Sequence, residues 1–320
     1  MGVNTDSSED FGGHLGVLKF FTLNLEYATS RVLMTRANED TTEELSRKLE
    51  GIYSMFLWIE DLDTEEGKER FKETIKVFEE VSKHAWVSDL IKSKKKVTLL
   101  DICGGTGIGG IAFTKVLEGK GVTVELLVND LRRKALEKAI LFSRKILGRE
   151  IKTVYADASK IHENIRDIDI ALLHGLSTPH FNPWNMVRLV SSVARILKPD
   201  GLFLVEETDR IYNIFYLTGY KEVLPEKVGK DRVVFTLHSG YATKTGMFKR
   251  VVIDLITRET TEMETYFWSI AELAAIMWIF FGDVDFIPIR GDKNGFIIAR
   301  KPRNIDPQKY AKNPTMLETQ

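Results

Sequence analysis

The stretch Leu99-Leu-Asp-Ile-Cys-Gly-Gly-Thr-Gly-Ile-Gly-Gly110 decides the fold, because an apolar strand ends there and a glycine-rich loop leads into a helix. Glycines let a loop backbone approach a ligand closely, and free N–H groups at a helix start attract an anionic group. Gly105, Gly107 and Gly110 have the spacing GxGxxG, and Asp130 follows 25 residues after Gly105. Taken alone, this spacing is typical of a dinucleotide site with Asp130 on the ribose hydroxyls. An NAD-dependent oxidoreductase is therefore one hypothesis, although no Tyr-x-x-x-Lys hydride-transfer signature is present.

Strands and helices alternate along the chain after Lys96. Short apolar runs predict strands at Val97–Ile102, Val122–Asp130, Ile151–Ala156, Ile168–His174 and Leu202–Glu207. Amphipathic helices are expected at Leu131–Leu147 and Pro183–Lys198. Strands separated by helical segments predict an α/β fold with a doubly wound, mostly parallel sheet.

The regions before residue 96 and after Glu207 have different patterns of apolar residues. Apolar residues recur at helical spacing in residues 15–37 and 41–92, which predicts an N-terminal helical unit, residues 1–95. An antiparallel insertion at about 230–268 is expected from strands at Arg232–His238, Met247–Ile256 and Glu262–Trp268. A helix (Ser269–Phe281), two closing strands (Val284–Ile289 and Gly295–Arg300) and a polar tail, residues 303–320, complete the prediction.

Composition excludes several classes of protein. The 320 residues carry 45 Lys and Arg against 46 Asp and Glu, so there is no basic field for nucleic acid. A single cysteine, Cys103, excludes a disulfide scaffold and a cysteine-built metal site. The longest apolar run, Leu273–Gly282, is about half of the roughly 20 residues that span a bilayer. We therefore expect a cytoplasmic protein that is not bound to a membrane, and the scarcity of Gln indicates a thermophilic source.

Several motifs that follow one another along the chain resemble those of a known protein family. Asp101 precedes the glycines, Asn129-Asp130 ends the second strand, and Tyr155-Ala-Asp-Ala158 follows the third. Ile196-Leu-Lys-Pro-Asp-Gly-Leu-Phe-Leu-Val205 and Asn294-Gly-Phe-Ile-Ile-Ala-Arg-Lys-Pro302 complete the set. Together they resemble class I S-adenosylmethionine-dependent methyltransferases of the small-molecule type, over about two thirds of the chain. The resemblance implies a Rossmann-like domain at 96–302 with seven strands, the last antiparallel, and a substrate lid formed by residues 1–95.

The resemblance also implies a site for S-adenosylmethionine. Asp101 suits the methionine amino group, Asp130 the ribose and Asp157 the adenine. The full expected set is Asp101, Cys103, Gly104, Gly105, Thr106, Gly107, Asp130, Leu131, Asp157, Ala158 and His174. Each acid also has a structural interpretation, since Asp101 and Asp130 are good helix caps and Asp157 suits an ordinary loop. Cys103 stands where the family has a small residue, so we interpret it as small, buried filler and not as a nucleophile.

Candidate acceptor-side residues follow the fourth strand. His174 and His180 are expected near the methyl acceptor as catalytic residues, because histidine titrates near neutral pH. The alternative is that both are loop histidines bonded to backbone. Glu206, Glu207 and Asp209 end the fifth strand and could bind a metal, but no matching acid pair follows strand four, so we predict no metal.

The sequence therefore predicts a methyltransferase that acts on a small, apolar or aromatic molecule by in-line methyl transfer. Two alternatives stay open: the NAD-dependent oxidoreductase, and a non-catalytic methyltransferase-like binding or regulatory protein. The expected partner is a small-molecule substrate, with no nucleic acid and no membrane. The helix at Leu273–Phe281 and the N-terminal helices are candidates for a homo-oligomer interface.

Overall fold

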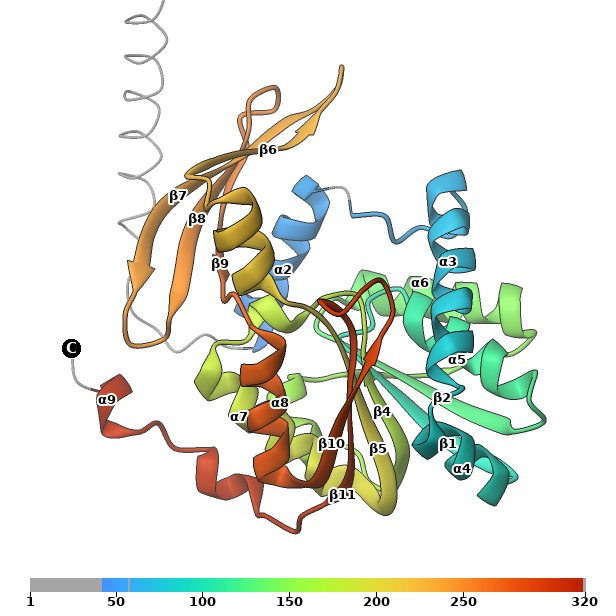
Figure 1. Ribbon diagram of the computed structural model, residues 1–320. Helices are drawn as coiled ribbons and strands as arrows, with labels where there is room; N and C mark the ends of the chain where they lie inside the picture. Colours follow the sequence, from blue (N-terminus) through green and yellow to red (C-terminus); the bar gives the residue numbers. More distant parts are fainter. Residues whose placement is uncertain (1–41, 57, 319–320) are drawn as a thin grey trace, which may run out of the picture. The chain divides into compact units, whose positions relative to one another are not determined.

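The computed structural model describes residues 42–56 and 58–318, and every structural statement below concerns these residues (Figure 1). The helix expected within residues 15–37 lies outside them. Seven strands form the main sheet, in the order β10-β11-β5-β4-β1-β2-β3. Their bounds are β1 Lys96–Ile102, β2 Thr123–Asp130, β3 Lys152–Tyr155, β4 Ile168–Leu173, β5 Leu197–Thr208, β10 Phe281–Pro288 and β11 Asn294–Pro302.

The pairing within this sheet is mostly parallel. β1 pairs in parallel with β2 and β4, and β2–β3 and β4–β5 are parallel as well. β11 runs antiparallel to both β5 and β10. The predicted α/β class, with seven strands and an antiparallel last strand, is confirmed. Because the chain goes from β1 to β2 and β3 on one side and returns to β4 on the other, the strand order reverses between β1 and β4.

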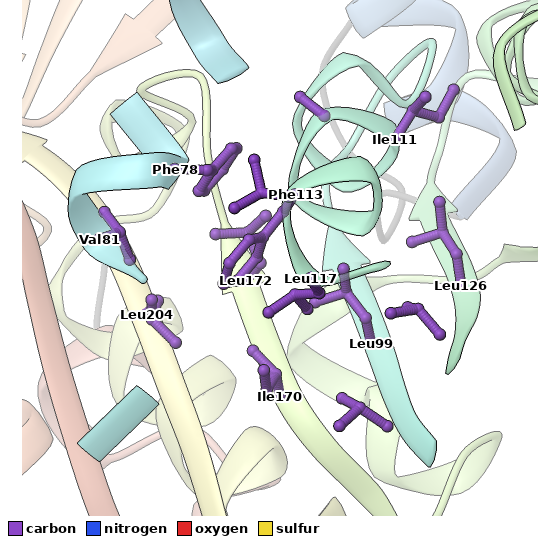
Figure 2. Close-up of a cluster of buried hydrophobic side chains, with 14 of the residues drawn as sticks. Phe78, Val81, Leu99, Ile111, Phe113, Leu117, Leu126, Ile170, Leu172 and Leu204 are labelled. Atoms are coloured by element: carbon purple, nitrogen blue, oxygen red, sulfur yellow. The ribbon is translucent and has the colours of Figure 1, made fainter. Parts of the chain in front are cut away.

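Helices cover both faces of the sheet. Residues of α3 to α6 pack in one core cluster and residues of α7 and α8 in the other. The bounds are α3 Glu65–Val81, α4 Ala85–Ser93, α5 Ile108–Glu118, α6 Arg133–Leu147, α7 Pro183–Ile196 and α8 Ile270–Phe280. Consecutive strand residues point to opposite faces, so Leu99 belongs to the first cluster and Leu100 to the second. Figure 2 shows the first cluster, where Phe78 of α3 and Phe113 of α5 meet above β4.

Capping residues explain where several helices begin and end. Thr64 accepts a hydrogen bond from Gly67 N at 3.0 Å and so caps the start of α3. Ser269 and Glu272 form a reciprocal capping box that starts α8. Gly148, at φ +68°, ends α6 in the left-handed conformation, as expected for a C-terminal glycine.

The expected N-terminal unit is divided in the structure. Phe78 and Val81 of α3 are fully buried, so α3 and α4 are part of the core of the main sheet. The helix α2 (Thr42–Phe56) packs instead on the second sheet, through Met55 against Val234 and Val252. Residues 1–41 of the predicted unit lie outside the described chain.

The second sheet has four antiparallel strands in the order β6-β7-β8-β9. These are β6 Val223–Val228, β7 Val233–Ala242, β8 Met247–Asp254 and β9 Thr260–Thr265, preceded by the π-helical segment η3, Ile211–Thr218. β6 was not expected from the sequence, because all six of its residues are exposed and give no apolar alternation. β9 ends before Trp268, whose buried indole donates to the carbonyls of Thr178 and Phe181, each at 3.1 Å.

Two short helices, η4 (Pro307–Tyr310) and α9 (Thr315–Glu318), lie in the expected C-terminal tail. Tyr310 of η4 contacts Phe280 with ring centroids 5.5 Å apart, so this part of the tail packs on α8. No helix in the described part of the chain is long and apolar enough to cross a membrane.

Candidate functional site

The polar residues singled out in the sequence gather at one edge of the main sheet. Parallel strands end at the same edge, and the crevice beside a reversal of strand order is where open α/β sheets bind ligands. Asp101, His174 and Glu206 each follow, by two residues, a leucine of the first core cluster: Leu99, Leu172 and Leu204. The period of two therefore places all three polar side chains on the face covered by α3 and α5.

Asp101 has one carboxylate oxygen that lacks a partner. Its Oδ2 accepts from Gly110 N at 2.7 Å, whereas Oδ1 is buried and has no hydrogen bond among the described residues. Burial raises the pKa of Asp101 to about 7. A β-carbon at Gly104 would lie 2.6 Å from Oδ2, so only glycine leaves room for this carboxylate. A buried acceptor without a donor fits a cationic ligand group such as an ammonium.

The loop between Asp101 and α5 passes through the left-handed region. Cys103 has φ +51°, a conformation that glycine adopts more easily, and Gly105 and Gly107 have φ +56° and +79°. Cys103 is half-buried, and burial raises the pKa of its thiol, which agrees with filler and not with a nucleophile. Thr106 donates its hydroxyl to the carbonyl of Glu60 at 2.7 Å, which ties the loop to the segment between α2 and α3.

Asp130 ends β2 and is held on both oxygens. Gly105 N donates to Oδ2 at 2.7 Å and Arg132 N donates to Oδ1 at 2.8 Å. The carbonyl of the adjacent Leu131 accepts from Ser46 Oγ of α2 at 2.5 Å. An ionised carboxylate has about four acceptor positions, so Asp130 retains capacity for ligand hydroxyls.

Arg132 and Glu60 lie over the glycine loop. The Arg132 guanidinium forms a two-pronged pair with the Glu60 carboxylate, at 2.8 and 3.0 Å, and stacks on Tyr53 with its carbon 3.8 Å from the ring centre. Arg132 Nη2 is 2.6 Å from the place where a β-carbon of Gly105 would lie. The cavity beside the loop, bounded by the loop, Asp101, Arg132, Glu60 and His174, is called the loop cavity below. Its volume is about 30 Å³.

Asp157 and Ala158 lie beyond the loop cavity, after β3. Asp157 accepts from Ser159 N at 2.9 Å and from Ser159 Oγ at 2.8 Å, and it caps the short helix η1 (Ala158–Glu163). Asp157 is therefore a helix cap and not the ordinary loop residue of the structural interpretation, and its other oxygen is left for a ligand. Asn129 donates to the carbonyls of Val154 and Ala156, at 3.0 and 2.8 Å, and joins β2 to the end of β3.

His174 lies between two cavities. Its ring packs on α5 so closely that a β-carbon at Gly109 would be 2.7 Å from Nδ1, and Nε2 is 3.5 Å from Glu206 Oε2. Burial lowers its pKa, while the Glu206 carboxylate opposes this shift. His174 borders both the loop cavity and a second, larger cavity of about 830 Å³. This second cavity, called the outer chamber below, is enclosed by α3, the ends of β4 and β5, and the β10–β11 turn.

His180 lies apart from both cavities. It ends η2 (Thr178–His180), and its Nε2 is 3.4 Å from the Tyr53 hydroxyl. Burial lowers its pKa to about 4, and Arg132 and Arg210 act in the same direction. The expected histidine pair is therefore divided, with His174 at the cavities and His180 behind Tyr53.

The strand-five acids point in different directions. Glu206 faces α3, whereas Glu207 is buried, accepts from Thr178 and pairs with Arg210 Nε at 3.1 Å. Asp209 accepts from Tyr212 N at 2.9 Å at the start of η3. Among the described residues, no three His, Cys, Asp or Glu side chains are grouped as a metal site would require.

Four side chains at the site were not expected from the sequence: Glu60, Arg70, Arg132 and Glu206 as a ligand-facing group. Arg70 of α3 lines both cavities and donates to the carbonyl of Ile59, and no carboxylate of the described chain lies within 4.0 Å of its guanidinium. Burial lowers its pKa. Two of them have a signal in the sequence: Arg132 stands two residues after Asp130, and Glu206 ends the fifth strand. Glu60 and Arg70 are brought in by tertiary packing.

Comparison with known proteins supports the class that this fold and edge define. Residues 76–230 match the model of the ubiE/COQ5 methyltransferase family. The crystal structure of the PH0226 protein from Pyrococcus horikoshii is similar, with a TM-score of 0.53 and 18% identity, over 79% of this chain and 98% of that one. The CcbJ methyltransferase from Streptomyces caelestis has a TM-score of 0.53 and 12% identity, over 71% and 90%. No curated protein sequence matches the chain.

The fold confirms the predicted Rossmann-like architecture, and the family match over residues 76–230 supports the predicted class, a class I S-adenosylmethionine-dependent methyltransferase. They also confirm S-adenosylmethionine as the cofactor.

Proposed function

We propose that this protein transfers a methyl group from S-adenosylmethionine, held beside the glycine loop, to a small molecule in the outer chamber. The observation that carries the proposal is that the two cavities share one wall, made by Trp58, Arg70, His174 and Gly175. S-adenosylmethionine supplies a methyl group that is already activated on a sulfonium sulfur. The protein then has to align donor and acceptor, which supplies on the order of 7–11 kcal/mol.

The cofactor residues of this proposal are those expected from the sequence, with one addition. Asp101 offers its unpartnered Oδ1 to the amino group, and Asp130 receives the ribose hydroxyls. Cys103, Gly104, Gly105, Thr106 and Gly107 form the cradle, and Leu131, Asp157 and Ala158 lie on the adenine side. Arg70 is the added residue, since a half-buried guanidinium without a carboxylate partner suits the cofactor carboxylate.

Cofactor entry requires the Glu60–Arg132 pair to move. The loop cavity of about 30 Å³ is far smaller than the roughly 300–1,000 Å³ of small-molecule pockets, and the pair lies directly against Gly105. The donor groups fit the cofactor, but the space for it opens only when these two side chains separate. This contact is also what favours the second candidate, a non-catalytic binding protein, in which the pair stays closed.

The acceptor side is proposed from the chamber walls. Trp58, Ile59, Val77 and Ile289 give these walls an apolar character, which supports the predicted small apolar or aromatic substrate. His174 is the acceptor-side histidine at the chamber, and His180 is neutral at pH 7 behind Tyr53. A cytoplasmic location, a thermophilic source and a homo-oligomer stay predictions.

Calorimetric titration with S-adenosylmethionine, S-adenosylhomocysteine and NAD tests the proposal. We expect micromolar binding of the two adenosyl ligands and none of NAD. Asp130→Asn keeps the size of the side chain and is expected to weaken adenosyl binding by roughly 100-fold, about two hydrogen bonds to a charged group. Asp63→Asn, an exposed change near α3, is the control and is expected to bind like the wild type.

The other outcomes separate the hypotheses. Binding of NAD alone would favour the oxidoreductase, and binding of no ligand would favour the non-catalytic protein. Unchanged adenosyl affinity in Asp130→Asn would contradict the assigned cofactor site.

A further inference from the structure

The outer chamber has the size of a ligand site and an uneven charge. Its volume of about 830 Å³ falls within the range of roughly 300–1,000 Å³ typical of small-molecule pockets. Four glutamate carboxylates border it, from Glu66, Glu69, Glu73 and Glu206, against two guanidinium groups, from Arg70 and Arg290, whereas the carboxylate of Glu207 is buried and paired with Arg210. A cleft lined mainly by one sign of charge concentrates ligands of the opposite sign.

Glu206 is the carboxylate that the fold fixes most firmly at the inner end of this chamber. Its Oε2 accepts from Gly175 N at 2.8 Å and lies 3.5 Å from His174 Nε2. Its Oε1 has no hydrogen-bond partner among the described residues. The side chain is 26% exposed, so one oxygen is held in place while the other is open to the chamber.

His174 gives an independent indication of a ligand at this place. Its side chain is only 10% exposed, yet neither ring nitrogen forms a hydrogen bond within the described chain. The ring is held by Phe78 and Phe296, with centroids 5.3 and 6.3 Å away, and it borders the wall shared with the loop cavity. With only the Glu206 oxygen nearby, 3.5 Å from Nε2, the imidazole has room for a hydrogen bond to a ligand at the cavity wall.

We propose that the methyl acceptor is a primary or secondary amine, bound as its ammonium form by Glu206 Oε1 beside His174. The apolar walls at Trp58, Val77 and Ile289 then enclose the body of the molecule. Glu66 of α3 adds a second carboxylate at the chamber, whereas Glu69 and Glu73 are paired with Lys72 and Lys76. This inference rests on the proposed methyl transfer and names the chemistry of its acceptor.

The transfer balances in atoms and charge. The ammonium first gives one proton to Glu206, which passes it to water in the chamber. The freed lone pair on nitrogen forms the nitrogen–carbon bond as the carbon–sulfur bond breaks, and that electron pair stays on sulfur. The products are an N-methylammonium, the neutral thioether and one proton.

Matched probe pairs test the inference on the full chain saturated with S-adenosylhomocysteine. The pairs are 2-phenylethylamine with 2-phenylethanol and cyclohexylmethylamine with cyclohexylmethanol. Calorimetry at pH 7.5 is expected to give at least ten-fold tighter binding of an amine than of its alcohol. The preference is expected to fall with added KCl, because it is electrostatic. With S-adenosylmethionine instead, mass spectrometry is expected to detect the N-methyl product and no O-methyl product.

The variant Glu206→Gln keeps the acceptor for Gly175 N and removes the charge. We expect about a ten-fold loss of amine affinity, with alcohol and S-adenosylhomocysteine affinities unchanged. Glu79→Gln, on α3 but outside the chamber lining, is the matched control and is expected to keep the preference. If no amine binds better than its alcohol, or if Glu206→Gln keeps the preference, the inference is overturned. Failure of the proposed function is separate, because it would appear as absent S-adenosylhomocysteine binding.

Discussion

The loop cavity and the outer chamber lie on opposite sides of His174 and differ in how their space is filled. The loop cavity is about 30 Å³ and is crossed by the protein's own Glu60–Arg132 pair, whereas the outer chamber is about 830 Å³ and open. Both use the same sheet edge, and they share Arg70 of α3 and His174, which directly follows β4. The difference arises from one segment, Trp58–Asp61, which carries Glu60 over the glycine loop and hydrogen-bonds to Thr106.

The strand ends therefore place the polar groups of the site, whereas the segment between α2 and α3 decides whether a ligand can reach them. The Glu60 carboxylate neutralises Arg132 in the loop cavity, and Arg70 has no such partner at the shared wall. A ligand in the loop cavity must therefore replace an internal ion pair. A ligand in the outer chamber meets groups that are already open.

Truncation of Phe78, which supports the wall shared by both cavities, is expected to have the largest effect, a loss of stability. Phe78 is fully buried, stacks on Phe113 with centroids 4.5 Å apart and supports His174. Phe78→Ala is expected to lower the free energy of unfolding by about 3–5 kcal/mol, measured by urea denaturation. Phe78→Leu, which leaves a smaller void, should lose clearly less. Equal losses in the two variants would show that the packing volume at this position does not decide stability.

Opening the loop cavity is expected to have an intermediate effect. Glu60→Gln replaces a charged pair with Arg132 by a neutral hydrogen bond, which is weaker by about 1–1.5 kcal/mol. We therefore expect S-adenosylhomocysteine to bind up to about ten-fold more tightly by calorimetry. Glu43→Gln is the control, because its pair with Arg133 is exposed. Weaker binding in Glu60→Gln would contradict the idea that the pair competes with the cofactor.

The smallest expected effect is the release of a proton from Asp101 when the cofactor product binds. Its pKa, about 7 in the folded protein, lies above the unfolded value of 3.8, so folding retains a proton between these values and stability falls as the pH rises through this range. The cofactor amino group favours the ionised carboxylate. Binding of S-adenosylhomocysteine at pH 6 should therefore release up to one proton, and at pH 8.5 none. Calorimetry in buffers of different ionisation enthalpy measures this release.

Asp101→Asn provides the control for that linkage. The amide does not titrate, so the variant should release no proton from this position at either pH. Proton release that persists in Asp101→Asn would assign the linkage to another group.

Local sequence signals predicted the elements of the main sheet well. Thr64, Ser269 and Gly148 mark helix ends that the structure reproduces, because capping depends on a few neighbouring residues. The strand β6 was not predicted, because its six exposed residues show no apolar alternation and its backbone is ordered by pairing with β7. The predicted unit of residues 1–95 was drawn from helical spacing alone, which does not say which sheet a helix covers.

By itself, the sequence determined the α/β sheet, its order of strands and helices, and the acids at the strand ends. These follow from periodicity and from the rule that parallel strands end at one edge. Only the tertiary structure decided that His174 and His180 separate, that Glu60 neutralises Arg132 above Gly105, and that Glu206 faces an open chamber. Each of these depends on residues at least about 30 positions apart in the chain meeting through packing, and no local pattern encodes such contacts.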